Sequence, residues 1–336
     1  MAVRSRLALL TSLGSPRRGR RSLSLFSGPS PSGWSKVVSD AEKIVGYPTS
    51  FMSLRCLLSD ELSNVAMHVR KLVGTKHPLL NTASQRSLAE ITELIHTAFL
   101  VHRGIVNLKE WTFSDGPLKD MQFGNKMAVL SGDFLLANAC TGLAQLNNTK
   151  VVELISSAIG DLVQGVYYEN SNSNSAEGKL SMASWEDQAF LSHGALLAKS
   201  CQAAMELARH DAEAQTLAYE YGKHLALAHK LNLDLQPFMK SGSDPVVFSL
   251  DSAPAVFHRL IVGHEIWTRQ LQQAQISTPQ TDYSKLWSGI RSGGGVKQAV
   301  DLCTEHGNTA LEAIRRFPPS EARSALENIA GAVARF

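Results

Sequence analysis

Length, composition and charge narrow the possibilities before any motif is considered. The chain has 336 residues, 44% of them hydrophobic, which suits one large buried core and no more than one or two domains. The formal net charge is +3, but six arginines precede the first acidic residue, Asp40, and without them 27 basic residues face 30 acidic ones. The body of the chain is therefore slightly acidic, which excludes the basic footprint of a nucleic-acid-binding protein.

Residues 1–35 have the composition of a mitochondrial transit peptide that ends in a Pro/Gly/Ser linker. They are rich in Arg and Ser, lack acidic residues and contain small apolar clusters. A merely disordered N-terminus is the alternative, and a secretory signal is disfavoured because polar residues interrupt Leu7–Leu13 and arginines follow it. No run approaches the roughly 18 apolar residues that span a bilayer. We therefore predict a leader over 1–35, a folded domain over 36–336, and a location in the mitochondrial matrix or at the inner membrane.

The four cysteines are too scattered for a disulfide framework or a zinc site. No two of them share a short spacing, so free thiols in a reducing compartment are predicted. They are Cys56, Cys140, Cys201 and Cys303.

Apolar residues recur at helical spacing along most of the chain, which predicts an all-α fold without strand and helix alternation. The predicted helices are Leu88–Ile105, Lys126–Leu146, Val151–Tyr168, Trp185–His210 and Ala212–Leu233. Loops are expected at Glu169–Ser184, Lys240–Asp244 and the glycines of Ser292–Gly295. A last helix should begin at Pro318–Ser320, with Leu326, Ile329 and Val333 on one face.

Four segments resemble, in order and spacing, the motif-bearing helices of long-chain trans-polyprenyl diphosphate synthases. They are Leu88–His102, Phe123–Ala137, Tyr221–Phe238 and Asp251–Phe257. The resemblance runs from about residue 40 to the C-terminus. It implies an isoprenoid-synthase-type bundle of long antiparallel helices. In that family two DDxxD motifs on facing helices bind Mg²⁺ ions, which assist departure of the diphosphate before isopentenyl diphosphate attacks the carbocation.

The chain departs from the family at its first metal-binding motif. The five positions read Arg103, Gly104, Ile, Val and Asn107, so that a cation stands where a carboxylate belongs. The Arg-Arg pair that follows in the family falls at Trp111–Phe113, which has no charge. The resemblance therefore implies that Mg²⁺ cannot bind here.

The other motifs are degenerate as well. The second DDxxD reads Leu233, Asp234, Leu, Gln and Pro237, which leaves one carboxylate. The isopentenyl diphosphate motif is reduced to Gly74–Pro78, and a Lys-Thr pair becomes His193–Gly194. A structural role is preferred over a catalytic one for the polar residues Asp234, Lys126 and Asp133. They would serve packing, capping or a core hydrogen bond. His102 is an exposed polar residue or a contact to a partner.

The same resemblance points to two positions that would help to set the length of the product. Ala98 and Phe99 lie five and four residues before Arg103, where the family's chain-length determinants stand, although core packing explains Ala98 equally well. One helical segment of the family is also missing between Pro78 and Leu88, where only nine residues, Leu79–Ser87, intervene. Apolar faces that this segment would cover need another chain to cover them.

This pattern of loss resembles the partner chains of heteromeric synthases that make the ubiquinone side chain. It implies a non-catalytic subunit, with no metal of its own, which docks on a catalytic subunit through the family's dimer interface. The catalytic subunit would supply Mg²⁺ and the chemistry, and the complex would condense isopentenyl diphosphate onto farnesyl diphosphate. An isoprenoid-binding scaffold of ubiquinone biosynthesis is the alternative. A chain active by itself through relocated ligands is disfavoured, because Glu90, Glu93 and Asp115 recreate no carboxylate pair beside Asp234.

Overall fold

The helices follow the periodicity of the sequence, but several extend further than it predicts. The computed structural model describes residues 83–108, 118–172, 181–239, 248–276 and 283–335. All of them belong to one compact unit of the chain, residues 64–336. Within these ranges every regular element is a helix, which confirms the all-α prediction. The predicted leader, the Gly74–Pro78 motif and Trp111–Phe113 lie outside the described residues.

Five long helices form the body of the unit. They are α3 (Ala83–Arg103), α4 (Leu118–Gln145), α5 (Thr149–Asn172), α8 (Ala212–Met239) and α12 (Gly294–Arg315). A further long helix is made of α6 (Met182–Ala189), the π-helical turn η2 (Phe190–Gly194) and α7 (Ala195–Leu207). Shorter helices complete the unit: α9 (Ala253–Val262), α10 (His264–Ile276), α11 (Ser284–Ser292) and α13 (Glu321–Val333).

Some boundaries differ from the sequence prediction. Helix α5 continues through Glu169 to Asn172, and α6 begins at Met182, so the predicted loop between them is shorter at both ends. The glycine loop at Ser292–Gly295 is reduced to Gly293, because α11 ends before it and α12 begins after it. Helix α3 begins at Ala83, so residues 83–87 of the interval before Leu88 belong to α3.

Side-chain caps explain several helix starts. The Ser181 hydroxyl accepts a hydrogen bond from Ser184 N, and the Ser184 hydroxyl accepts one from Ser181 N, which closes a capping box at α6. Ser320 caps α13 by accepting from Arg323 N at 3.1 Å. The predicted start of the last helix is therefore right, although Ile329 is exposed and Ala330 takes the buried position on that face.

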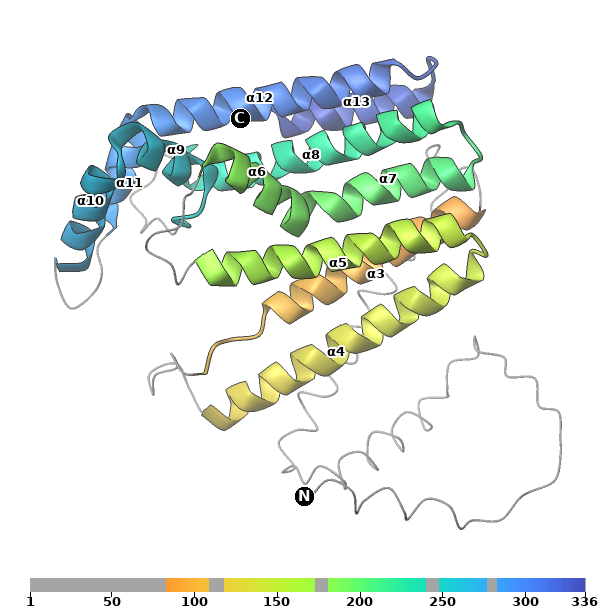
Figure 1. Cartoon of the computed structure of the whole chain (residues 1–336), viewed down its shortest axis with the longest axis horizontal. Coiled ribbons are helices and arrows are strands. Elements are labelled where there is room, and N and C mark those ends of the chain that lie inside the picture. Colours follow the sequence, from red (N-terminus) through yellow and green to blue (C-terminus); the bar gives the residue numbers. More distant parts are fainter. Residues whose placement is uncertain (1–82, 109–117, 173–180, 240–247, 277–282, 336) are drawn as a thin grey trace, which may run out of the picture. The chain divides into compact units, whose positions relative to one another are not determined.

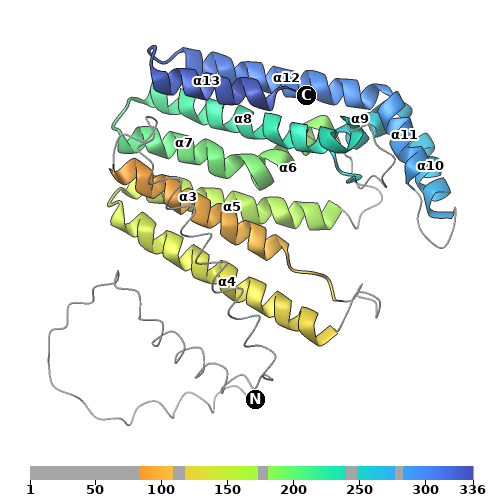
Figure 2. The same cartoon turned by 180° about the vertical axis from the view of Figure 1, so that it is seen from behind.

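The long helices lie side by side in the order α12, α8, α7, α5 and α3, and α4, as both views show (Figures 1 and 2). One apolar cluster lies between α3, α4, α5 and α7, with Ile95, Phe99 and Ile155 among its members. A second joins α6, α8, α9 and α12 around Leu231 and Leu235. Burial of these side chains is the main stabilising contribution to the fold.

Helix α5 crosses the π-turn η2 at Gly165, and this contact has a measurable consequence. A Cβ at Gly165 would lie 2.6 Å from Ser192 N and 2.7 Å from Ser192 Cα, so Gly165→Ala must push the two backbones apart. We expect it to lower the free energy of unfolding by about 2 kcal/mol. Gly160→Ala on the same helix meets nothing within 4 Å and should raise it by up to about 1 kcal/mol. Urea denaturation of both variants tests this, and equal effects would contradict the close contact.

A histidine pair, with His306 buried and His224 mostly buried, joins α8 to α12. His224 and His306 approach with 2.8 Å between their Nδ1 atoms, and His224 Nε2 lies 3.2 Å from a Glu220 carboxylate oxygen. Glu220 fixes the proton on His224 Nε2, so His306 must donate from Nδ1, which leaves its buried Nε2 without a hydrogen bond. Burial, followed by the charges of His224 and Lys223, lowers the pKa of His306 to about 4. Burial also lowers the pKa of His224, against the opposing effects of Glu220 and Glu305.

This pair predicts a loss of stability in acid. Because the folded-state pKa of His306 lies below its ordinary value, its stabilising contribution is present above about pH 6.5 and is lost as the pH falls toward about 4. We expect the free energy of unfolding to fall by on the order of 2–3 kcal/mol from this source between about pH 7 and about pH 4.5. Urea titrations at both pH values should show a smaller fall for His306→Asn. An unchanged fall would contradict the assignment.

Candidate functional site

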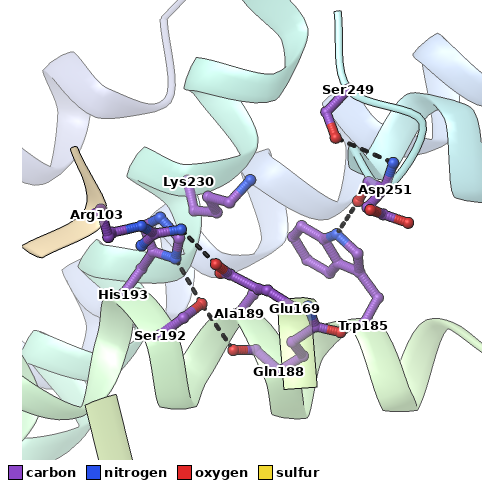
Figure 3. A pocket seen from close by; sticks show the side chains of 10 residues that line it. All are labelled: Arg103, Glu169, Trp185, Gln188, Ala189, Ser192, His193, Lys230, Ser249 and Asp251. Atoms are coloured by element: carbon purple, nitrogen blue, oxygen red, sulfur yellow. Dashed lines mark hydrogen bonds and ion pairs between the residues drawn. The ribbon is translucent and has the colours of Figure 1, made fainter. Parts of the chain in front are cut away.

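A pocket of about 280 Å³ opens where α3 ends and α5, η2, α8 and the start of α9 converge. Four charged side chains line it: Arg103, Glu169, Lys230 and Asp251 (Figure 3). The remaining lining residues are Trp185, Gln188, Ala189, Ser192, His193 and Ser249. The pocket thus lies beside Arg103, the first position of the first degenerate motif, and beside Lys230, one turn before Asp234 of the second.

Arg103 pairs with Glu169 at the mouth of the pocket. Arg103 is the last residue of α3, and its guanidinium donates to a Glu169 carboxylate oxygen near the end of α5 (Figure 3). Both side chains are partly buried, which strengthens the pair relative to one in open solvent. The cation at the first position of the degenerate motif is therefore neutralised by a carboxylate that lies 66 residues further along the chain.

Asp234 is also paired. Lys230 Nζ donates to Asp234 Oδ1 at 2.5 Å, one turn apart on α8, and the Asp234 side chain is only 9% exposed. The second oxygen, Oδ2, accepts a hydrogen bond from Ala253 N at 3.0 Å. Asp234 therefore caps the first turn of α9 from another helix, which satisfies one free backbone N–H and complements the helix dipole.

The π-turn supplies an uncharged imidazole. Ser192 Oγ donates to Gln188 O at 2.9 Å and lies 2.7 Å from His193 Nδ1, so His193 donates from Nδ1 (Figure 3). Burial, and then the charges of Lys230 and Arg103, lowers the pKa of His193 to about 3. His193, where the family has a lysine, is therefore neutral at physiological pH.

Asp251 completes the charged lining. Its backbone carbonyl accepts a hydrogen bond from Trp185 Nε1 at 3.1 Å, and its N–H donates to Ser249 Oγ at 3.2 Å. Burial, and then the nearby Glu169 carboxylate, raises the pKa of its side chain. The four charged side chains that line the pocket thus balance, two cations against two carboxylates.

The residues at the family's metal positions do not fit a magnesium cluster. Mg²⁺ requires several oxygen ligands, whereas Arg103 and Leu233 offer none and both oxygens of Asp234 already have partners. Within the described ranges no group of three or more His, Cys, Asp or Glu side chains could hold a metal ion.

The structure separates the other degenerate positions from the pocket. Gly104 and Asn107 lie in the exposed segment after α3, which Asn125 ties to α4 by accepting from Val106 N at 2.9 Å and donating to Val106 O at 2.8 Å. Leu233 is 51% exposed on α8. Pro237 is inside α8, and its carbonyl accepts from Trp287 Nε1 at 3.2 Å.

The remaining candidates lie on α3 and α4. Ala98 and Phe99 are both buried, and Phe99 belongs to the cluster between α3, α4, α5 and α7. Asp133 does not lie in the helical core: its side chain is 64% exposed, with an oxygen 3.5 Å from His102 Nε2. His102 packs over Gly132, where a Cβ would collide with the imidazole. Lys126 is also on α4, where it is not left without an interaction partner.

Sequence reasoning did not find Glu169, Lys230, Trp185 or Asp251 as pocket residues. The sequence pattern assigns Glu169 to a polar loop and Trp185 to an ordinary helix start. Lys230 did carry a signal, because a lysine four residues before an aspartate on one helix predicts an ion pair. Asp251 stands at the head of a recognised segment, but nothing in the sequence placed it opposite Glu169.

Comparison with known proteins gives a consistent result. The polyprenyl synthetase family profile matches residues 63–243. A human protein named all trans-polyprenyl-diphosphate synthase PDSS2 is 57% identical, covering 98% of this chain and 93% of its own length. That alignment extends over 378 positions, so the human protein carries segments that this chain lacks.

More distant relatives agree. A probable mitochondrial hexaprenyl pyrophosphate synthase from Neurospora crassa is 33% identical, covering 74% of this chain and 57% of the relative. The solved apo form of an Arabidopsis medium/long-chain length prenyl pyrophosphate synthase has a TM-score of 0.61 at 27% identity, and the match covers 90% of this chain and 96% of that one. The helical arrangement of the chain is therefore that of the solved prenyl synthases.

Proposed function

The chain belongs to the polyprenyl synthetase family, and from this premise we propose that it is the non-catalytic subunit of a heteromeric trans-polyprenyl diphosphate synthase. A catalytic subunit of the same family binds Mg²⁺ and condenses isopentenyl diphosphate onto farnesyl diphosphate, and the product serves as the ubiquinone side chain. This chain binds no metal. Its place is the mitochondrion, which its Arg-rich leader and its relatives named as mitochondrial support.

One observation carries the proposal: the two charged residues at the degenerate metal positions, Arg103 and Asp234, each form an ion pair within the chain. Arg103 is paired with Glu169, and Asp234 with Lys230. A diphosphate that entered this pocket would have to displace Glu169 and Asp234 from their cations, and it would meet the carboxylate of Asp251. Without metal charge, departure of diphosphate lacks its main electrostatic assistance.

The outer face of α4 supports the need for a partner. Its buried residues, Gly132, Leu135, Ala139 and Leu143, form one stripe, and α4 packs chiefly against α3. The apolar residues exposed on α4 and α5 are Leu118, Val129, Leu130, Phe134, Val163, Tyr167 and Tyr168. We call this set the α4–α5 face. Four of its seven members lie on α4 alone, and exposed large apolar side chains in such number favour a protein interface.

Helix α4 also has the length and hydropathy of a membrane-crossing segment. An 18-residue window reaches a mean hydropathy of 1.4, and 22% of it is buried. However, α4 carries Lys126 and Asp133 within its length and packs on α3 through the buried stripe. A helix that buries one apolar side against α3 and another against a partner would have the same length and hydropathy as a membrane span.

Reconstitution tests the proposal. The purified chain, supplied with farnesyl diphosphate, isopentenyl diphosphate and Mg²⁺, should yield no elongated product, and the mixture with the catalytic subunit should yield a long-chain product. A catalytic subunit whose DDxxD aspartates are replaced by alanine should remain inactive in the mixture, which assigns the chemistry to that subunit. Robust turnover by the isolated chain would refute the proposal. Co-purification with later ubiquinone enzymes, but not with a synthase, would favour the scaffold alternative.

A further inference from the structure

The corner between α9 and α10 is a second surface of interest. Helix α9 ends at Val262 and α10 begins at His264, so Gly263 alone turns the chain. Its φ of +82° lies in the left-handed region that glycine adopts without strain. In both views α10 and α11 lie at one end of the helices, on a different side of the unit from α4 (Figures 1 and 2).

The corner is held rigidly from behind. His258 on α9 lies 3.2 Å from the Gln270 side-chain oxygen on α10, and its ring meets the buried Trp267 edge to face. Glycines of α12 allow α9 to approach closely, since a Cβ at Gly295 would lie 2.6 Å from Pro254 O. Side chains on the outside of the corner are therefore presented by a fixed scaffold.

Three large aliphatic side chains project outward there. Leu260, Ile261 and Ile266 are 48%, 49% and 47% exposed, within seven residues of sequence. Exposed aliphatic residues are ordinary when they are scattered, but a cluster on a rigid turn indicates a contact surface.

The charge of this region is opposite to that of the rest of the body. Among the residues of α9, α10 and α11, Glu265 is the one acidic residue, against the four cations Arg259, Arg269, Lys285 and Arg291. Residues 36–336 as a whole carry more acid than base. The excess of positive charge is therefore local to α9, α10 and α11, three helices that pack against one another, and the first two of them carry the aliphatic cluster.

We propose that the α9–α10 corner docks on an anionic lipid surface. Leu260, Ile261 and Ile266 enter the boundary between headgroups and acyl chains, while Arg269, one turn after Ile266 on α10, remains with the anionic headgroups. Exposed aliphatic residues flanked by basic side chains suit such a surface, because a bilayer accepts both at the same depth. An acidic protein surface would attract the cations but would not require the exposed aliphatic side chains. The experiment must therefore distinguish an acidic protein from a lipid surface.

Vesicle binding of the full-length chain tests the proposal. The vesicles are phosphatidylcholine, with or without about a third phosphatidylglycerol, and binding is measured by co-sedimentation. The Arg-rich leader contributes the same background to every variant. We expect Arg269→Gln to weaken binding to the anionic vesicles about fivefold above that background. Leu260→Ser, Ile261→Ser and Ile266→Ser combined should weaken it at least about tenfold.

A matched control and a local readout complete the test. Ile329→Ser with Arg315→Gln removes an exposed aliphatic residue and a cation elsewhere and should leave binding unchanged. Hydrogen exchange should slow at 259–269 when anionic vesicles are added. Wild-type binding by the corner variants, or protection confined to other segments, would overturn the proposal. If soluble polyglutamate slows hydrogen exchange at 259–269, and still does so in the variant with the three serine substitutions, the partner is an acidic protein instead.

The corner is independent of the proposed subunit role. Its variants should still co-purify with a catalytic synthase subunit, because the α4–α5 face is unchanged. Loss of vesicle binding with retained complex formation supports the lipid surface, and failure of complex formation in the unaltered chain would concern the proposed function alone.

Discussion

Asp234→Ala is expected to lower the free energy of unfolding by about 3–4 kcal/mol, which is a large fraction of the stability of an ordinary domain. The substitution leaves the Lys230 ammonium, which is 20% exposed, without its partner. It also removes the acceptor for Ala253 N at the start of α9. Asp234→Asn should cost less, about 2 kcal/mol, because an amide oxygen can still accept that hydrogen bond while the ion pair is lost. Chemical denaturation of the three proteins gives the measurement.

Two comparisons decide whether Asp234 is structural or a metal ligand. Asp133→Ala removes a carboxylate that is 64% exposed and should change stability by no more than about 0.5 kcal/mol. Millimolar Mg²⁺ should leave the melting temperature of the unaltered chain in place, because a ligand that does not bind the folded state cannot stabilise it. A rise in melting temperature with Mg²⁺ that disappears in Asp234→Asn would show a metal site and contradict the assignment.

Local patterns predicted the helices well where one face is buried along the whole length. Val151, Ile155, Ala158 and Leu162 on α5 recur every three or four residues and are all buried, so periodicity alone places that helix. Periodicity could not predict the π-turn at Phe190–Gly194, because one extra residue in a turn leaves the apolar pattern on either side intact. It also missed most of α9, α10 and α11, which are short and are separated by single glycines or polar segments.

The site was predictable in part. The loss of carboxylates at Arg103–Asn107 and Leu233–Pro237 is written in the sequence, and it predicts a site without a metal cluster. The sequence does not predict the contacts that these residues make instead, because the tertiary fold brings Arg103 to Glu169 and Asp234 to Ala253. Whether a remaining carboxylate is free or capped depends on such contacts between distant segments, which a single sequence does not reveal.

Leu130→Asp combined with Phe134→Asp should abolish the complex with the catalytic subunit, weakening its affinity by more than about 100-fold. The two side chains lie one turn apart on α4, and they are 53% and 52% exposed in the isolated chain. Burying each of them against a partner is worth about 1.5–3 kcal/mol, and a carboxylate in the same place must be desolvated without a counter-ion. Affinity can be measured by surface plasmon resonance, and prenyl elongation by the mixture should fall in parallel.

The fold of the variant should survive, which makes the result specific to the interface. Because both residues are about half exposed, the substitutions should change the free energy of unfolding by less than about 1 kcal/mol. Ile329→Asp on α13, where the isoleucine is 44% exposed, is the matched control and should leave affinity and elongation intact. If the doubly substituted chain still binds the catalytic subunit with unaltered affinity, the partner covers some other surface. The apolar α4–α5 face would then need a different explanation, and the membrane-crossing interpretation of α4 would become the first to test.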